Sequence, residues 1–137
     1  MVYECPLSAS LTSLLIHFNW TNVALFSTGI RTTGVSDAVQ SAFSKRGIHI
    51  LHQRTLDDIC YPGWYFDENE FVGWVKEIKS EARIFVIIGP NDCHLTLLEA
   101  MHQQNLFETN EYFVIGVNTE DFSFEGKING YLFHTII

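Results

Sequence analysis

Clustered positive charge is what this sequence most clearly lacks. The chain of 137 residues holds 8 Lys and Arg against 16 Asp and Glu, which gives a formal net charge of -8. Its basic cluster, Lys45-Arg46, falls at the end of a predicted helix, where cations favour the helix dipole. Binding to nucleic acid needs cations gathered against phosphates, so no nucleic-acid partner is expected.

Long apolar runs are also missing. No segment reaches the roughly 18 consecutive apolar residues of a membrane span, so we expect no direct span in this chain. The first ten residues show no basic stretch followed by an apolar run, and no signal peptide is predicted. These features fit a cytoplasmic protein, or a fragment whose targeting signal lies elsewhere.

Motifs that bind phosphate, metals or catalytic water are absent. The chain has no Gly-x-Gly-x-x-Gly, Gly-x-x-x-x-Gly-Lys-Ser/Thr, Gly-x-Ser-x-Gly or His-Glu-x-x-His pattern. His49 and His52 should point to opposite faces of a strand, and His94 and His102 are too far apart on one helix to share an ion. We therefore predict no catalytic residue, no metal and no cofactor.

Cysteine is scarce, with three residues, Cys5, Cys60 and Cys93. An odd number leaves at least one thiol unpaired within the chain, and the spacings match no zinc motif. Small buried residues or free thiols are the favoured interpretation. A disulfide between Cys60 and Cys93 is the alternative.

Hydrophobic periodicity predicts helices and strands in alternation. Helices are expected over residues 8–18, 35–46, 67–81 and from 90 onward, and strands over 22–28, 48–52, 83–89, 111–118 and 130–137. Phe18 should close the apolar face of the first helix, and Leu95, Leu98, Met101 and Leu106 should face inward from the last. Residues 53–66 are expected to form a loop, because Cys60-Tyr61-Pro62-Gly63 is a strong turn signal.

This order predicts one α/β domain over residues 1–137, with an open parallel sheet covered by helices on both faces. In such sheets ligands bind beyond the carboxyl ends of the strands. The loops at these ends supply the candidate ligand-binding residues, which are Thr28, Gly29, Thr32, Pro90, Asn91, Asn118 and Glu120. For any one loop, ordinary capping and turn chemistry is the more common explanation of such residues.

A glycosylation pattern lies between the first helix and the first strand. Asn19-Trp20-Thr21 matches Asn-x-Ser/Thr, the acceptor of N-linked glycans in secreted proteins. Trp20 is expected to pack at this helix–strand joint. Such packing could limit access to Asn19, so the pattern predicts glycosylation only if that side chain points to solvent.

Four segments of the sequence resemble those of a known family. The segments are His17-Phe18-Asn19-Trp20-Thr21, Lys45-Arg46-Gly47-Ile48, the strand segment around Ile84 to Ile88, and Glu111 to Ile115. Together they are similar to the second lobe of type I periplasmic-binding-protein-like ligand-binding domains, the ANF receptor family. Tyr112-Phe113-Val114-Ile115 leading to Asp121-Phe122 is most similar to ectodomains of receptor guanylate cyclases and natriuretic peptide receptors.

This resemblance implies a non-catalytic, extracellular ligand-binding lobe of a cell-surface receptor, which signals through lobe or dimer rearrangement. The expected partners are a small-molecule or peptide ligand, and a missing first lobe or a receptor dimer partner. Guanylate cyclase activity would belong to an intracellular domain outside this chain. The alternative is a small cytosolic α/β protein that binds a nucleotide or phosphate near Thr28 to Thr33 or Gly89 to Asp92.

Overall fold

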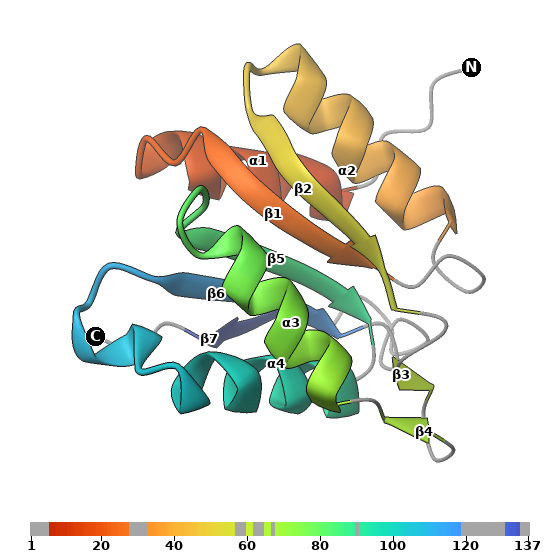
Figure 1. Ribbon diagram of the computed structural model, residues 1–137. Helices are drawn as coiled ribbons and strands as arrows, with labels where there is room; N and C mark the ends of the chain where they lie inside the picture. The colour runs from red at the N-terminus through yellow and green to blue at the C-terminus, as the bar shows by residue number, and fades with distance from the viewer. Residues whose placement is uncertain are drawn as a thin grey trace.

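Helices and strands alternate along most of the chain in a computed structural model (Figure 1). The structure describes residues 6–27, 33–56, 60–61, 65–66, 68–89, 91–118 and 131–134. Within them the elements are α1 (Pro6–His17), β1 (Asn22–Ser27), α2 (Thr33–Lys45), β2 (His49–Thr55), β3 (Cys60–Tyr61), β4 (Tyr65–Phe66), α3 (Glu68–Ile78), β5 (Ile84–Gly89), α4 (Asn91–Gln103), the 3-10 turn η1 (Leu106–Glu108), β6 (Phe113–Asn118) and β7 (Tyr131–His134).

The main sheet has five strands in the order β2-β1-β5-β6-β7. The pairs β1–β2, β1–β5 and β5–β6 are parallel, and β7 pairs antiparallel with β6. One register row crosses the sheet near its carboxyl edge and joins Thr55, Ser27, Ile88, Val117 and Tyr131. The short strands β3 and β4 form a separate antiparallel pair.

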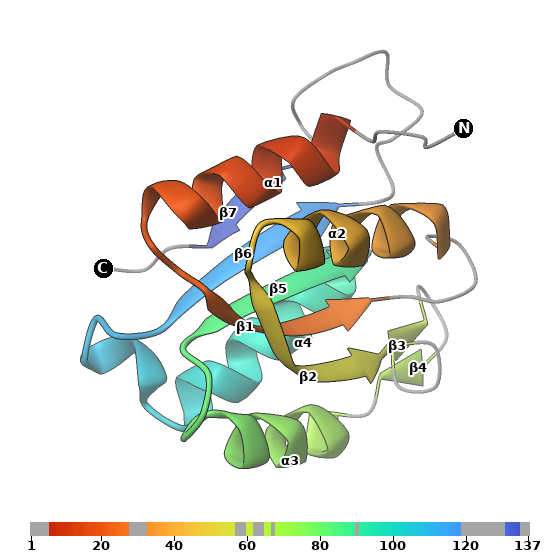
Figure 2. The same cartoon turned by 90° about the horizontal axis from the view of Figure 1, so that it is seen from above.

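Helices cover both faces of the sheet, as Figure 2 shows, with α1 and α2 on one face and α3 and α4 on the other. The chain moves outward from β1 to β2 through α2, and then crosses back to β5 through α3. Since crossovers between parallel strands are right-handed as a rule, reversing the direction places the two helices on opposite faces. The expected α/β fold with an open, mostly parallel sheet is therefore confirmed.

Buried side chains alternate between the two faces of the central strands. Ala24, Phe26, Phe85 and Ile87 pack toward α3 and α4. Val23, Leu25, Val86 and Ile88 pack toward α1 and α2. A strand covered on both faces has to be apolar at every position, which explains the continuous apolar runs in the sequence.

Left-handed residues follow α1 and α2 and let the chain turn into the next strand. Asn19 (φ 58°) follows α1, and Gly47 (φ 74°) follows α2. After α2, the N–H of Ile48 donates to the carbonyl of Phe43 at 2.9 Å, the long-range bond of a Schellman cap. Gly47 can adopt this φ without strain because it has no Cβ.

Three sequence predictions need correction. Residues 53–66 are not one loop, since β2 continues to Thr55 and the β3–β4 pair follows. Leu95 is 61% exposed and does not face inward, because the inner face of α4 is formed by Cys93, Leu97, Ala100 and Met101. Phe18 is 51% exposed, because α1 ends at His17 before this residue can complete the helical face.

Candidate functional site

The carboxyl edge of the sheet gathers the ends of the parallel strands. Ser27, Thr55, Gly89 and Asn118 are the last residues of β1, β2, β5 and β6. The helices that leave β1 and β5 lie on opposite faces, so the connections diverge at this point. Such a topological switch point opens a crevice between two strand ends, and open α/β sheets bind their ligands there.

A small polar network lies at the β1 side of this switch point. The Ser36 hydroxyl donates to the Ser27 hydroxyl at 3.2 Å, and Gln40 Nε2 donates to the Ser36 hydroxyl at 3.2 Å. Ser27 and Ser36 are 5% and 6% exposed. The Ser27 carbonyl also accepts the N–H of Leu56 at 2.8 Å. These bonds fix the first turns of α2 against the end of β1.

The β5 side is held by α4. His94 is 1% exposed, and its Nε2–H donates to the carbonyl of Val117 near the end of β6 at 3.1 Å. Cys93, the residue before it, is buried and disulfide-bonded. The interpretation of Cys93 as a free buried thiol is therefore wrong. Strand β3, which contains Cys60, contacts α4.

The opposite, amino edge contains a joint built on aromatic rings. Trp20 stacks between Phe18 and Phe113, with ring centroids 4.8 Å from each. The expectation that Trp20 packs at the helix–strand joint is confirmed. A hollow of about 320 Å³ lies beside it, with Asn19, Glu81 and Arg83 among the lining residues.

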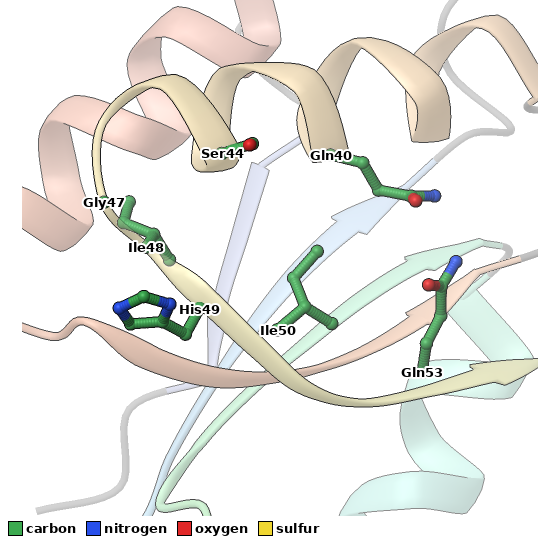
Figure 3. A pocket seen from close by; sticks show the side chains of 7 residues that line it. All are labelled: Gln40, Ser44, Gly47, Ile48, His49, Ile50 and Gln53. Atoms are coloured by element: carbon green, nitrogen blue, oxygen red, sulfur yellow. The ribbon is translucent and has the colours of Figure 1, made fainter.

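A second hollow, of about 460 Å³, lies along the outer side of the sheet between α2 and β2 (Figure 3). Gln40 and Ser44 line it from the helix, and His49 and Gln53 line it from the strand. It is open and follows the edge strand, away from the diverging connections of β1 and β5. We therefore take the carboxyl edge, and not this hollow, as the candidate ligand site.

Among the described residues, no group of three or more His, Cys, Asp or Glu side chains is arranged to hold a metal ion. No helix in the described part of the chain has the length and apolar character required to cross a bilayer.

Comparison with known families agrees with this architecture. Residues 4–126 match the profile of a family described as the receptor family ligand binding region. The chain belongs to this family. It is also similar to Guanylate cyclase 32E of Drosophila melanogaster, with 23% identity over 124 residues. That similarity covers 89% of this chain and 10% of the relative, so the chain spans about a tenth of the relative's length.

Two of the seven predicted ligand-binding residues lie in the described part of the chain. Asn91 is the first residue of α4 and Asn118 the last of β6, so the backbone of both lies at the carboxyl edge. Five other predicted residues lie outside the described part of the chain, namely Thr28, Gly29, Thr32, Pro90 and Glu120. The seven therefore stay predictions about this edge.

Sequence reasoning missed the hydrogen bond between two side chains at this edge of the receptor family ligand binding region. Ser27 opens the predicted loop after the first strand, but Ser36 reads as an ordinary polar residue near a helix start. Their positions could have indicated the contact, since Ser27 ends a buried strand and Ser36 lies in the first turn of the helix that follows. For the contact between His94 and Val117 the sequence signal was weaker, because it consisted only of a single histidine on the inner side of a helix.

Proposed function

We propose that this chain is the extracellular ligand-binding lobe of a cell-surface receptor, and that the ligand lies at the carboxyl edge between the ends of β1 and β5. The observation that carries the proposal is the family match over residues 4–126. The switch point of the sheet supports the proposed location, because open α/β sheets bind their ligands at such points. The lobe is non-catalytic and binds a small polar molecule or a peptide.

The disulfide at Cys93 supports an extracellular location. Disulfides persist in secreted proteins and ectodomains, whereas cytosolic thiols are kept reduced. Of the other two cysteines, Cys60 lies on β3, which contacts the helix that contains Cys93. We therefore pair Cys60 with Cys93. This bond argues against the cytosolic nucleotide- or phosphate-binding alternative.

Signalling in this proposal is a shift between two arrangements of lobes or of receptor subunits. A ligand shifts such an equilibrium only by as much as its affinity differs between the two states. Moving a receptor from about 1% to about 99% active requires roughly a 10⁴-fold difference in affinity. One wall of a crevice offers too few contacts for that, so a second lobe or a dimer partner completes the site. By analogy with the cyclase relative, the intact protein would couple this change to cyclase activity.

Hydrogen–deuterium exchange on the intact protein tests the ligand site. Libraries of small polar metabolites and of short peptides are first screened by thermal shift. Compounds that raise the melting temperature are then added to the exchange experiment. Protection is expected in peptides that cover the end of β1 with the start of α2, and the end of β5 with the start of α4. Protection confined to the amino edge, around Asn19 and Arg83, would contradict the proposed site.

A further inference from the structure

The joint between α1 and β1 is a Schellman cap with Asn19 in the left-handed position. Asn19 has a φ of 58°, and its N–H donates to the carbonyl of Ile16 at 3.0 Å. The N–H of Trp20 donates to the carbonyl of Leu15 at 2.8 Å. Asparagine tolerates this conformation better than other residues that carry a Cβ. The cap turns Asn19 out of the helix, and both Asn19 and Thr21 are exposed.

An exposed aromatic ring lies directly beside Asn19. Phe18 is 51% exposed, and its ring stacks on Trp20 at an interplanar angle of 22°. Trp20 in turn stacks on Phe113 of β6. Most large apolar side chains in the described residues are buried. The Phe18 ring, which stacks on Trp20 and meets the His17 ring edge-on, is half exposed and leaves a surface that suits an apolar covering group.

We propose that Asn19 carries an N-linked glycan whose first sugar packs against the exposed surface of Phe18. Asn19-Trp20-Thr21 is the single Asn-x-Ser/Thr pattern in the chain. The inference rests on the extracellular location proposed above, because the modification takes place in the secretory pathway. The first N-acetylglucosamine is β-linked and presents one face of axial C–H bonds. Such a face packs well on an aromatic ring.

The covalent step transfers an oligosaccharide from a lipid-linked diphosphate donor. The amide nitrogen Nδ2 of Asn19 forms a bond to C1 of the first sugar. The bond between C1 and the diphosphate oxygen breaks, and the lipid diphosphate leaves with that electron pair. The amide nitrogen releases one proton, which balances the step. Asn19 therefore remains an amide, keeps its backbone conformation and projects the sugar toward solvent.

The surroundings of the cap have room and polar partners for the sugar hydroxyls. The hollow of about 320 Å³ beside Asn19 is also lined by Glu81, Arg83 and Glu111. Arg83 and Glu111 form an ion pair in which both side chains are more than half exposed. Carboxylate and guanidinium groups of this kind accept from and donate to sugar hydroxyls. The joint thus combines an apolar platform with a polar rim.

Capping alone explains Asn19 but not the whole pattern. A left-handed cap requires only Asn or Gly at one position, and it places no demand on an exposed Thr two residues later. Variants at Thr21 therefore separate glycosylation from capping. Thr21→Ala removes the acceptor pattern without disturbing the cap, and Thr21→Ser preserves it. Asn19→Gln is unsuitable, because glutamine would be strained at this φ.

The first measurement is site occupancy in the intact protein, expressed in animal cells that make only oligomannose glycans. Protein at the cell surface is captured with a membrane-impermeant biotin reagent. Peptides are then treated with peptide N-glycosidase F in ¹⁸O water. We expect ¹⁸O-labelled Asp at position 19 in the wild type and in Thr21→Ser, and unmodified Asn19 in Thr21→Ala. Surface protein without this label would overturn the glycan and leave the proposed function standing. Absence from the surface would count against the proposed function itself.

The second measurement tests the packing on Phe18. Endoglycosidase H leaves only the first sugar on Asn19, whereas peptide N-glycosidase F removes it. We expect the trimmed protein to keep its melting temperature, and full removal to lower it by about 2–4 °C. In Phe18→Ala the difference between the two treatments should shrink to what the conversion of Asn19 to Asp causes by itself. Leu95→Ala, at an exposed residue on α4, should behave as the wild type does. An equal loss on full removal with and without the Phe18 ring would overturn the packing.

Discussion

The indole ring of Trp20 stacks on the ring of Phe113, with centroids 4.8 Å apart and 28° between the ring planes. Trp20 follows α1, and Phe113 is the first residue of β6. The contact therefore joins the beginning of the chain to a strand that lies more than ninety residues further along the sequence. The N–H of Phe113 also donates to the carbonyl of Arg83 at 2.9 Å. The amino edge of the sheet is therefore held by both a backbone bond and stacked rings.

Trp20→Ala should destabilise the fold strongly. The half-buried indole loses its contacts with both neighbouring rings, and we expect the free energy of unfolding to fall by about 2–3 kcal/mol. Urea denaturation followed by circular dichroism measures the change. Leu95→Ala is the control, since an exposed leucine should change stability by less than about 0.5 kcal/mol. Equal losses in the two variants would show that the stack adds no stability.

The hydroxyl of Ser36 should stabilise the carboxyl edge. Ser36→Ala removes the donor to Ser27 and the acceptor for Gln40 in a buried setting. We expect the free energy of unfolding to fall by about 1 kcal/mol, the usual net value of such a bond. Ser41→Ala, at an exposed position on the same helix, is the matched control and should be nearly neutral. A larger effect at Ser41 than at Ser36 would contradict this account of the edge.

His94 and His102 provide a second matched pair, on α4. His94→Leu removes the hydrogen bond to Val117 from a buried position, so we expect a loss of about 1–3 kcal/mol in unfolding free energy. His102 is exposed near the end of the same helix, and His102→Ala should change stability by less than about 0.5 kcal/mol. Denaturation curves of the two variants, measured side by side, check the difference. A neutral His94→Leu variant would mean that the bond does not hold α4 to β6.

The disulfide gives a prediction that peptide mapping can decide. Non-reducing digestion should yield one peptide pair that links Cys60 to Cys93, with Cys5 outside this pair. Cys93→Ser should lower the free energy of unfolding by about 2–4 kcal/mol, as expected for a closed loop of this size. Cys5→Ser is the control and should leave both the pairing and the stability unchanged. A Cys5–Cys93 peptide would contradict the pairing.

Sequence periodicity predicted the order of elements well, because the strands of a sheet covered on both faces are continuous apolar runs. The periodicity failed to predict which leucines of α4 face the core, because a shift of one or two residues changes the side of the helix on which a side chain lies. Leu95 and Leu97 are both leucines, but each residue turns the helix by about 100°, so the two side chains lie on nearly opposite sides of α4. Only the packing of Cys93 and Leu97 against the sheet selects the buried face.

The direction of β7 and the existence of β3 could not be predicted from local patterns. An apolar run such as Tyr131–His134 shows that a strand forms, but not whether it pairs parallel or antiparallel. Cys60-Tyr61-Pro62-Gly63 indicates a turn, and the short strands beside it are set by pairing between Cys60 and Phe66. The sequence could propose the candidate site only as an edge, since Ser27 and Ser36 meet through tertiary contacts that no motif records.

The central claim is that this chain lies outside the cell as part of a receptor, and labelling of living cells tests it most directly. Lys45 and Lys76 are exposed, so a membrane-impermeant amine reagent should modify both in the intact protein. Mass spectrometry of the recovered peptides, with and without permeabilisation, gives the result. The account predicts labelling of Lys45 and Lys76 on unpermeabilised cells. Labelling of these lysines only after permeabilisation would contradict it.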